Sequence, residues 1–219
     1  MKILALEFSS AQRSVAVLDS EQGSRFAIAE EAGGRSTHAF AMIEEALRKE
    51  GAEREQIAVL AVGIGPGSYN GVRMAIALAQ GWQLANKVKI LGVSATDCLA
   101  RQARQMGLRG NVQTLIDAQR NEFYLAGYKI SDTKEQIREP LRLASLAEVQ
   151  SKIDAKEIVI GPEASDWFPV AKSVFPSALS LAQLASARGD FVSGDKLEPI
   201  YLRPTAFIKA PPPRIIPTT

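Results

Sequence analysis

The sequence contains few of the residues on which metal centres and disulfide-stabilised folds depend. Among its 219 residues there is one cysteine, Cys98, and one histidine, His38. A single cysteine excludes an internal disulfide framework and fits a reducing cytosol, so we expect a cytoplasmic protein. A single histidine excludes every metal or catalytic site that needs a histidine pair. We therefore expect no metal site and no catalytic site built on a histidine pair in this chain.

Long apolar runs and a large charge imbalance are also missing. The most apolar stretch, residues 72–85, is interrupted by Arg73, Gln80 and Gln83, so we expect no membrane-spanning helix. No charged and then apolar leader precedes the first expected strand, which argues against a secretory signal. The formal net charge is +2, which is too small to indicate nucleic-acid binding by itself. The length allows one large domain or two small ones.

The sequence does contain a regular alternation of strand and helix patterns. Strands are expected at residues 2–8, 14–19, 25–30, 57–62, 88–93, 112–117, 122–130 and 157–161, and helices at 36–50, 71–86, from 94 onward and at 177–188. Residues 132–155 are rich in charge, and we interpret them as a connecting segment with a short helix. The tail, residues 210–219, contains four prolines and is predicted to be disordered. This order predicts an α/β fold with mixed sheets covered by helices.

A glycine-rich segment, residues 63–71, lies between an apolar strand and the most apolar helix. Many proteins present backbone N–H groups to an anion with this order of elements. The spacing nevertheless fits neither standard phosphate motif, because Gly71 is followed by Val72 and Arg73 and no Gly-x-Gly-x-x-Gly pattern is complete. We therefore interpret the segment as a tight turn that fixes where the next helix begins.

The helix expected at residues 71–86 is more apolar than contact with one sheet requires. On a helical projection its three polar residues fall within about 80° of one another. Two rows of small residues at i, i+4 spacing permit close approach of another helix, namely Gly71-Ala75-Ala79 and Ala77-Gly81-Ala85. Two interpretations remain open. The helix is buried in the protein's own core, or one side of it contacts a partner chain beside helix 36–50.

Three polar groupings are weaker candidates for chemistry. Glu7 is followed by Ser9 and Ser10, a pattern that can hold a hydrated Mg²⁺ and contact phosphate, although an ordinary polar turn is the simpler interpretation. Residues 117–122 place charges at the tip of an expected hairpin, either as a solvated turn or with an arginine that reaches a phosphate or a carboxylate. A Ser68-His38-Asp117 triad can be written down, but nothing in the spacing favours it.

Several segments taken together resemble one family. They are residues 3–10, 14–17, 65–73, 90–94, 116–124 and 199–203, together with His38. In this order and at these spacings they are similar to the TsaB (YeaZ) subunit of bacterial tRNA threonylcarbamoyladenosine (t6A) synthesis. The resemblance covers residues 2 to about 205, and Gly65-Pro-Gly-Ser68 is its most specific part.

The resemblance implies an actin-like/Hsp70-like ATPase (ASKHA) fold of two related subdomains, each a mixed sheet flanked by helices. We expect an N-terminal subdomain at residues 1–108 and a smaller one at 109–209. The family is grouped with peptidase M22 glycoprotease-like sequences, but the missing triad and metal site do not support peptidase activity. The resemblance instead implies a non-catalytic paralogue of TsaD. The assembly transfers threonylcarbamoyl from its AMP conjugate to the adenosine beside the anticodon in tRNAs that read A-starting codons.

The resemblance also implies partners and sites. TsaB-type proteins bind the TsaD homologue through their first two helices, form homodimers by the same helices when isolated, and are joined by the TsaE homologue with ATP. This implies that tRNA is reached through the complex and that the chain itself requires no cofactor. Whether ATP or ADP with Mg²⁺ binds at the interface of the complex stays an open question. The partner surface is expected to comprise His38, Met42, Glu45, Val72, Met74, Ala75, Leu78, Ala79 and Trp82. A vestigial nucleotide or phosphate site is expected at Glu7, Ser9, Ser10, Gly65, Gly67 and Ser68.

The sequence departs from the family pattern in two places. The first strand normally ends in Asp and here ends in Glu7, and the loop normally reads Ser-Phe-Thr-Gly where this chain has Ser68-Tyr-Asn-Gly71. Both changes weaken the case for ATP hydrolysis by this chain alone. The alternative is a stand-alone actin-fold ATPase or small-molecule kinase, which needs a complete nucleotide pocket in the second half. A metal-independent hydrolase is a more remote third reading.

Overall fold

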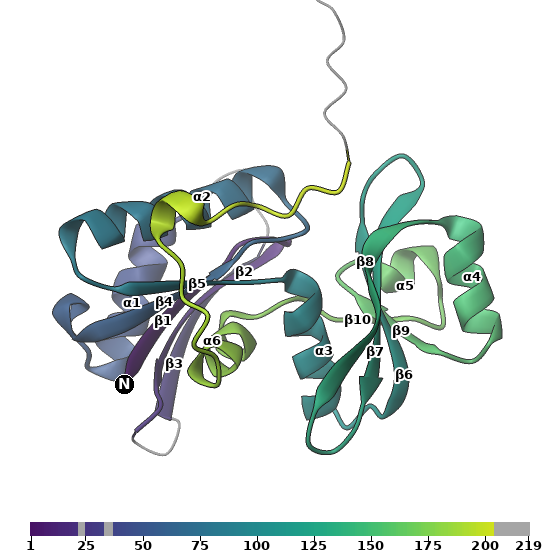
Figure 1. Ribbon diagram of the computed structural model, residues 1–219, viewed down its shortest axis with the longest axis horizontal. Coiled ribbons are helices and arrows are strands. Elements are labelled where there is room, and N and C mark those ends of the chain that lie inside the picture. Colours follow the sequence, from purple (N-terminus) through teal and green to yellow (C-terminus); the bar gives the residue numbers. More distant parts are fainter. Residues whose placement is uncertain (22–24, 33–36, 204–219) are drawn as a thin grey trace, which may run out of the picture.

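The computed structural model describes residues 1–21, 25–32 and 37–203, so the predicted disordered tail at 210–219 lies outside the described residues. The chain forms two lobes, each built on a five-stranded sheet (Figure 1). The two lobes lie side by side along the longest axis of the molecule, and α3 and α6 lie between the two sheets.

The first lobe contains a mixed sheet in the order β3-β2-β1-β4-β5. Its strands are β1 Lys2–Glu7, β2 Gln12–Asp19, β3 Arg25–Ala32, β4 Ile57–Gly63 and β5 Lys89–Val93. The first three strands pair antiparallel, whereas β4 pairs parallel to β1 and β5 parallel to β4. Helices α1 Ala39–Glu50 and α2 Tyr69–Ala85 and the short helix η1 Arg54–Gln56 belong to this lobe.

The second lobe repeats this arrangement, with a sheet in the order β10-β9-β6-β7-β8. Its strands are β6 Gly110–Asp117, β7 Glu122–Ile130, β8 Glu135–Ser145, β9 Ile158–Gly161 and β10 Lys172–Ser173. The helices of the second half are α3 Ala95–Gln105, α4 Leu146–Asp154, α5 Ala164–Trp167 and α6 Ala178–Ser186, followed by the short helix η2 Gly194–Lys196. An antiparallel meander followed by parallel strands thus occurs twice, which confirms the predicted α/β ASKHA fold of two related mixed sheets.

Alternation along the central strands decides which helix covers which face. In β1, Leu4 and Leu6 face the side on which α1 and α2 pack, whereas Ile3 and Ala5 face α6. Both faces are apolar because both are covered, which is why this strand is a nearly continuous apolar run. In the second lobe α3 covers one face of the sheet, and α4 and α5 cover the other.

The path of α6 differs from the predicted division of the chain. This helix lies within the range 109–209 that we assigned to the second subdomain, yet it packs on β1 and β2 of the first lobe. Conversely, α3 lies within 1–108 and packs on the second sheet, where Leu99 joins a cluster with Val112 and Ile116. Each sheet therefore receives a helix from the other half of the sequence. The division near residue 108 stays a prediction, but it does not separate the two cores.

The segment at 132–155 was predicted to be a connection with a short helix; α4 confirms the helix, but the first part was interpreted wrongly. It contains an eleven-residue strand, β8, which pairs antiparallel with β7 at the edge of the second sheet. Its polar residues include Arg138, Glu139 and Arg142, and Pro140 interrupts its apolar pattern. An edge strand tolerates such a sequence because one of its sides has no neighbour to pair with and much of its surface meets water.

Candidate functional site: the face of helix α2 and the cleft beside it

The glycine loop before α2 packs tightly against the turn after β1. The Ser68 amide donates to the carbonyl of Ser9 at 2.6 Å, and the Ser68 hydroxyl accepts from the amide of Gly71 at 3.3 Å. A Cβ at Gly67 would lie 2.1 Å from the Ser9 carbonyl oxygen, and one at Gly71 would lie 1.9 Å from that of Phe8. The glycines thus permit close backbone approach, and part of the helix N-terminus is already engaged. This geometry favours the interpretation of the loop as a tight turn and not as an open phosphate-binding loop.

Glu7 does not point into a solvent-accessible site. Its side chain is fully buried, and one carboxylate oxygen accepts from the amide of Ser9 at 2.7 Å. The other oxygen has no hydrogen-bond partner among the described residues and lies where a Cβ at Gly63 would be only 2.2 Å away. Burial raises the pKa of this carboxyl group. The Glu7 carboxyl group is therefore closed off from solvent, and its expected contribution to a Mg²⁺ or phosphate site stays a prediction.

A cleft of about 840 Å³ separates the lobes beside this loop. Ser9, Ser10, Gly67 and Ser68 line its first-lobe wall, as expected from the sequence, whereas Gly65 is buried outside it. The second-lobe wall is formed by Ile116, Asp117, Gln119, Pro162 and Glu163.

The charged residues that line this cleft are Arg13 on the first-lobe wall and Asp117 and Glu163 on the second-lobe wall. Burial, and then repulsion from Asp117, raise the pKa of Glu163. Two carboxyl groups on one wall would repel the phosphates of ATP, and the turn at residues 67–71 has part of its amide groups engaged. No group of three or more metal-ligating side chains occurs among the described residues. The cleft thus presents one guanidinium group opposite two carboxyl groups.

Helix α2 contacts other parts of the protein on three sides. Val72, Ala75 and Ala79 are almost fully buried against the sheet and α1. On the polar flank, Gln80 donates to the carbonyl of Gly194 at 2.8 Å, in the segment that follows α6. Gln80 and Gln83 thus mark an intramolecular contact with Gly194, whereas Arg73 is exposed.

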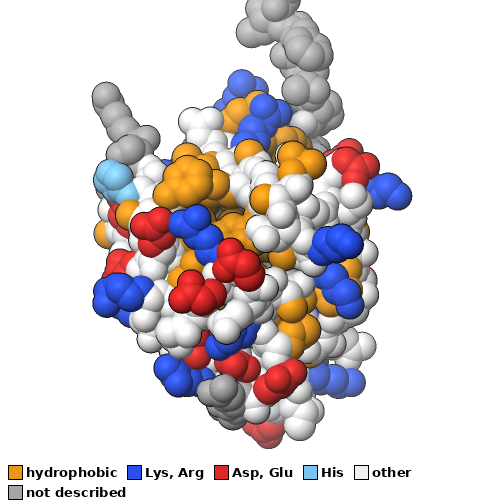
Figure 2. Space-filling model, turned by 90° about the vertical axis from the view of Figure 1, so that its left-hand side faces the viewer, with side chains coloured by type: hydrophobic (Ala, Val, Ile, Leu, Met, Phe, Trp, Pro, Cys, Tyr) orange, Lys and Arg blue, Asp and Glu red, His pale blue; other side chains and the backbone are white. Residues whose placement is uncertain are grey.

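The remaining side of α2 is exposed and apolar. It carries the second row of small residues, Ala77-Gly81-Ala85, flanked by Met74, Leu78 and Leu84. Leu84 is 91% exposed, and a Cβ at Gly81 would meet no atom within 4 Å. We call Met74, Ala77, Leu78, Gly81, Leu84 and Ala85 the α2 stripe. Figure 2 shows hydrophobic side chains gathered on the upper part of this side of the molecule, near His38.

Helix α1 contributes a second exposed apolar residue group next to His38. Phe40 is 72% exposed, and Ala41 is exposed beside it. The His38 ring lies 2.9 Å from the carboxylate of Glu31, and hydrogen bonds from the backbone and ring of His38 lower the pKa of Glu31. His38 is therefore held at the edge of this surface.

The structure changes the membership of the expected partner surface. Met42, Val72, Ala75 and Ala79 lie in the protein's own core and cannot touch a partner without unfolding. His38 and Glu45 are exposed, and Met74, Leu78 and Trp82 are half-buried. Phe40, Ala77, Gly81 and Leu84 were not in the expected set, and all four are exposed. Both small-residue rows were visible in the sequence, but only the structure shows that the first faces inward and the second outward.

The remaining polar candidates have other partners. The Ser68 hydroxyl caps α2 and His38 pairs with Glu31, so the Ser68-His38-Asp117 arrangement is not assembled. At the tip of the β6–β7 hairpin, three consecutive residues, 119–121, adopt positive φ angles near 60°. This turn receives Arg203 from the end of the described chain, which donates to the carbonyl of Gln119 at 3.2 Å.

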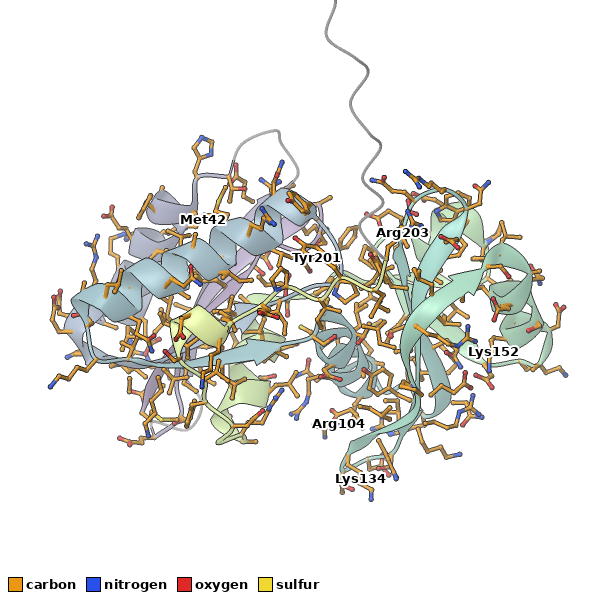
Figure 3. The ribbon with its side chains drawn as sticks, turned by 45° about the horizontal axis from the view of Figure 1, so that its top comes forward. Met42, Arg104, Lys134, Lys152, Tyr201 and Arg203 are labelled. Carbon is orange, nitrogen blue, oxygen red and sulfur yellow. The ribbon has the colours of Figure 1, made fainter. Side chains whose placement is uncertain are left out.

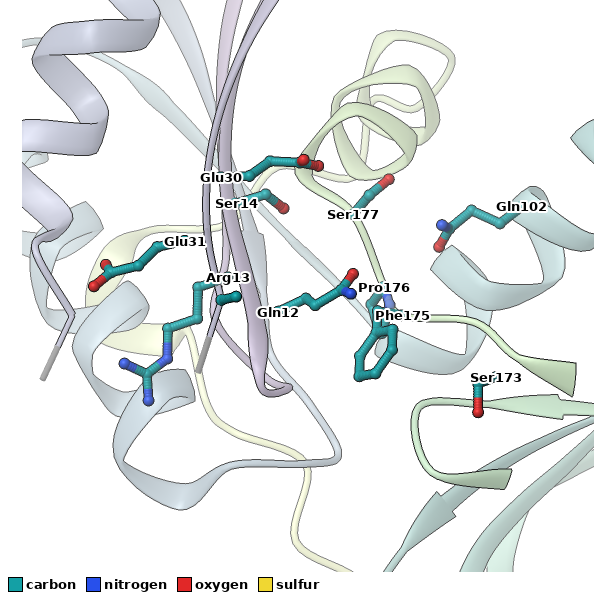
Figure 4. Close-up of a pocket in the computed structure, with 11 residues that line it drawn as sticks. Gln12, Arg13, Ser14, Glu30, Glu31, Gln102, Ser173, Phe175, Pro176 and Ser177 are labelled. Atoms are coloured by element: carbon teal, nitrogen blue, oxygen red, sulfur yellow. The ribbon is translucent and has the colours of Figure 1, made fainter. Parts of the chain in front are cut away.

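A second hollow, of about 570 Å³, lies between the ends of β2 and β3 and the segment that leads into α6. In Figure 4, Gln12, Ser14 and Glu30 lie on the side of the strands that faces Ser177 and Gln102, whereas Arg13 and Glu31 point to the other side. Its lining mixes hydroxyl, amide and acidic groups without a convergent set of donors, so it does not define a ligand class.

No helix within the described ranges is long and apolar enough to cross a membrane.

Comparison with known proteins places these features in a family context. The model of the family described as TsaD, tRNA N6-adenosine threonylcarbamoyltransferase, matches residues 34–185. The chain is 26% identical to the tRNA threonylcarbamoyladenosine biosynthesis protein TsaB of Escherichia coli, over 93% of this chain and 95% of that protein. It is 28% identical to the TsaB protein of Haemophilus influenzae, over 93% and 94% of the two chains.

Two solved structures from Pseudomonas aeruginosa are similar over nearly their whole length. One is described as an uncharacterized protein with similarity to peptidase YEAZ, with a TM-score of 0.80 at 28% identity, covering 92% of this chain and 99% of that one. The other is described as YeaZ, with a TM-score of 0.78 at 27% identity and the same coverage.

Proposed function

We propose a function from one premise: this chain belongs to the TsaD family and, within it, to the TsaB (YeaZ) proteins. It takes part in t6A biosynthesis as a non-catalytic partner of the TsaD homologue. The surface that binds this homologue is the α2 stripe together with Phe40 and Ala41 of α1.

The exposed α2 stripe carries this proposal. A row of small residues flanked by larger apolar ones allows a second helix to approach closely and to bury Leu84 and Leu78 between the two chains. The same residues facing water would form an apolar area with no role in the fold, since the helix already has its sheet, α1 and the C-terminal segment as neighbours.

Two observations support a role without catalysis. This sequence contains only one histidine, His38, which pairs with Glu31, so it has no histidine pair to hold a metal ion. Glu7 is buried beneath the loop, and the cleft wall opposite is acidic. The threonylcarbamoyl transfer to the adenosine beside the anticodon is therefore assigned to the TsaD homologue, and this chain stabilises that subunit in its active assembly.

The other partners follow from the same proposal. The TsaE homologue joins with ATP, and tRNA is reached through the complex. ATP or ADP with Mg²⁺ binds at an interface between subunits. In the absence of the TsaD homologue, the α2 stripe pairs with a second copy of this chain. The assembly is cytoplasmic.

Co-purification with the TsaD homologue of the same organism tests the proposal. Gly81→Glu and Leu84→Glu place a charge on the stripe without a clash, and both are expected to lower the affinity by at least tenfold. Ala147→Glu, at an exposed position of α4 on the second lobe, is the matched control and should bind like the parent.

Thermal unfolding of each variant verifies that it is folded. A parent that forms no complex, or stripe variants that bind as tightly as Ala147→Glu, would refute the proposed surface. Ala75→Glu is unsuitable, because this residue is fully buried and its substitution would unfold the lobe.

The alternative function, a stand-alone ATPase or small-molecule kinase, is tested with the same material. ATP turnover by the purified chain alone, lost in Glu7→Gln but kept in the stripe variants, would favour it.

A further inference from the structure

The segment after α6 is anchored firmly at one end. We call residues 194–203 the strap. At its start, Gly194 accepts from Gln80 at 2.8 Å through its carbonyl and donates to the side-chain oxygen of Gln83 at 2.7 Å through its amide. Leu197 is 6% exposed and belongs to the core of the first lobe. This end of the strap is thus part of the first lobe.

The other end of the strap crosses to the second lobe. The Ile200 amide donates to the carbonyl of Ile64 at 2.9 Å, which is its last backbone contact with the first lobe. Three residues later, Arg203 pairs with the carboxylate of Glu122 at 2.5 Å and donates to Gln119. Figure 3 shows Tyr201 near α2 and Arg203 beside the second lobe.

An aromatic stack holds the strap where it leaves the first lobe. The rings of Tyr201 and Tyr69 stack with centroids 5.6 Å apart and planes inclined by 23°. The guanidinium of Arg73 lies over the Tyr69 ring, 4.3 Å from its centroid. Such stacking and cation–π contacts orient exposed side chains without burying them. Tyr69 and Tyr201 are in fact 53% and 44% exposed.

These contacts lie at the mouth of the interlobe cleft. Tyr69 lines its first-lobe wall and Gln119 its second-lobe wall, and the strap touches both. The other connections between the lobes run through α3 and α6, which pack on each other. There the Ser180 hydroxyl donates a hydrogen bond to the side-chain oxygen of Gln105 at 3.3 Å. The lobes are thus joined at a packed centre and again, independently, by the strap.

We propose that residues 200–203 of the strap act as a latch that holds the two lobes at a fixed opening of the cleft. The anchored end at Gly194 and Leu197 is buried, whereas Tyr201 is exposed and Arg203 is only half-buried, so the latch releases while the anchor stays in place. Release lets the lobes turn about the α3–α6 contact and opens the cleft between Ser10 and Asp117. This device regulates access to the cleft, and it is independent of whether the α2 stripe binds a partner.

Distance measurements on the full chain test the latch. Nitroxide labels at Arg48→Cys on α1 and Ala147→Cys on α4 report the separation of the lobes, and Cys98 is fully buried and remains unlabelled. Electron–electron double resonance on the otherwise unchanged chain should give one narrow distance distribution. Adding Tyr201→Ala with Arg203→Glu should at least double the width of the distribution or shift it to longer distances.

Two further variants separate a latch from a general loss of structure. Combining Arg203→Glu with Glu122→Arg restores the ion pair in reverse and should recover most of the narrow distribution. Arg142→Glu breaks a comparable pair with Glu148 inside the second lobe and should leave the distribution unchanged. An unchanged distribution in the Tyr201→Ala, Arg203→Glu variant, or a reversed pair that restores nothing, would overturn the proposal.

Discussion

The carboxyl group of Glu7 lies at the end of β1 in a place that water does not reach. One oxygen accepts from the Ser9 amide, and the other has no partner in the described part of the chain. Burial disfavours the charged form, which is why the pKa of this group is raised. A carboxylate here stabilises the turn through one hydrogen bond and costs stability through its charge.

Replacing Glu7 with Gln should therefore stabilise the protein at neutral pH. Because the pKa of Glu7 is higher in the folded than in the unfolded state, the folded parent binds the proton more tightly and loses stability as the pH rises between the two pKa values. Glu7→Gln keeps the acceptor for Ser9 and removes this loss. Its advantage over the parent should grow with pH, by at most about 1.4 kcal/mol per pH unit within that range.

Urea unfolding at a series of pH values from 4 upward measures this difference. Glu55→Gln, at an exposed carboxyl group, controls for the loss of one negative charge. If the stability of Glu7→Gln relative to the parent does not change with pH, folding does not raise the pKa of Glu7 and the prediction is wrong.

The hydroxyl of Tyr128 ties α3 to the second sheet. It donates to the carboxylate of Asp97 at 2.7 Å and lies 3.1 Å from the hydroxyl of Thr96, and burial raises its pKa. Tyr128→Phe leaves both acceptors inside the protein and should cost about 1–2 kcal/mol of unfolding free energy, measured by urea titration. Tyr124→Phe, which removes a hydroxyl without such bonds, should cost less than about 0.5 kcal/mol. Equal losses in the two variants would contradict this role.

At the scale of elements, different sides of helix α2 face different neighbours. Gly71 faces the backbone of Phe8, Val72 and Ala79 face the core, and Gly81 faces outward. Glycine within a helix weakens it when nothing requires the missing side chain. The two glycines of this helix thus differ in role. Gly71 is needed for close packing within the chain, whereas Gly81 is free to contact another helix.

Alanine at these two glycines should have opposite effects. Gly71→Ala puts a Cβ 1.9 Å from the Phe8 carbonyl oxygen and should destabilise the protein by about 2 kcal/mol or more, because backbone must move. Gly81→Ala meets open space and should stabilise it by about 0.5–1 kcal/mol. Thermal and urea unfolding of the two variants side by side measures both signs. A stabilising Gly71→Ala would contradict the tight packing of the glycine loop.

The elements of this fold could be predicted from the sequence where their apolar pattern was continuous. β1, β4 and α2 lie within a few residues of their expected positions, because each is buried on more than one side. β8 was missed because an edge strand with Pro140 and alternating charges has no such pattern. The burial of Glu7 was missed for a different reason: a carboxylate in a turn gives no sign in the sequence of what packs over it.

At the scale of the whole molecule, the two cores are not built from two consecutive halves of the chain. The apolar clusters of the second lobe consist entirely of residues between Ala95 and Val174. One of the two clusters of the first lobe requires α6, whose Leu181 and Ala182 cover Ile3 and Ala5. No local pattern in the sequence of α6 states which sheet it joins, since its apolar residues would suit either one.

Fragments of the chain should therefore fold according to these cores and not according to the predicted ranges. A fragment of residues 94–176 contains every member of both second-lobe clusters and should unfold cooperatively on heating, followed by circular dichroism. A fragment of residues 1–108 leaves the α6 face of its sheet uncovered and should aggregate or show no cooperative transition, because a bare apolar sheet face cannot be stable in water. Joining residues 177–203 to the fragment 1–93 through a flexible linker should restore a transition. If 1–108 instead unfolds cooperatively as a monomer, the first sheet does not depend on α6 and the predicted division at residue 108 is the physical one.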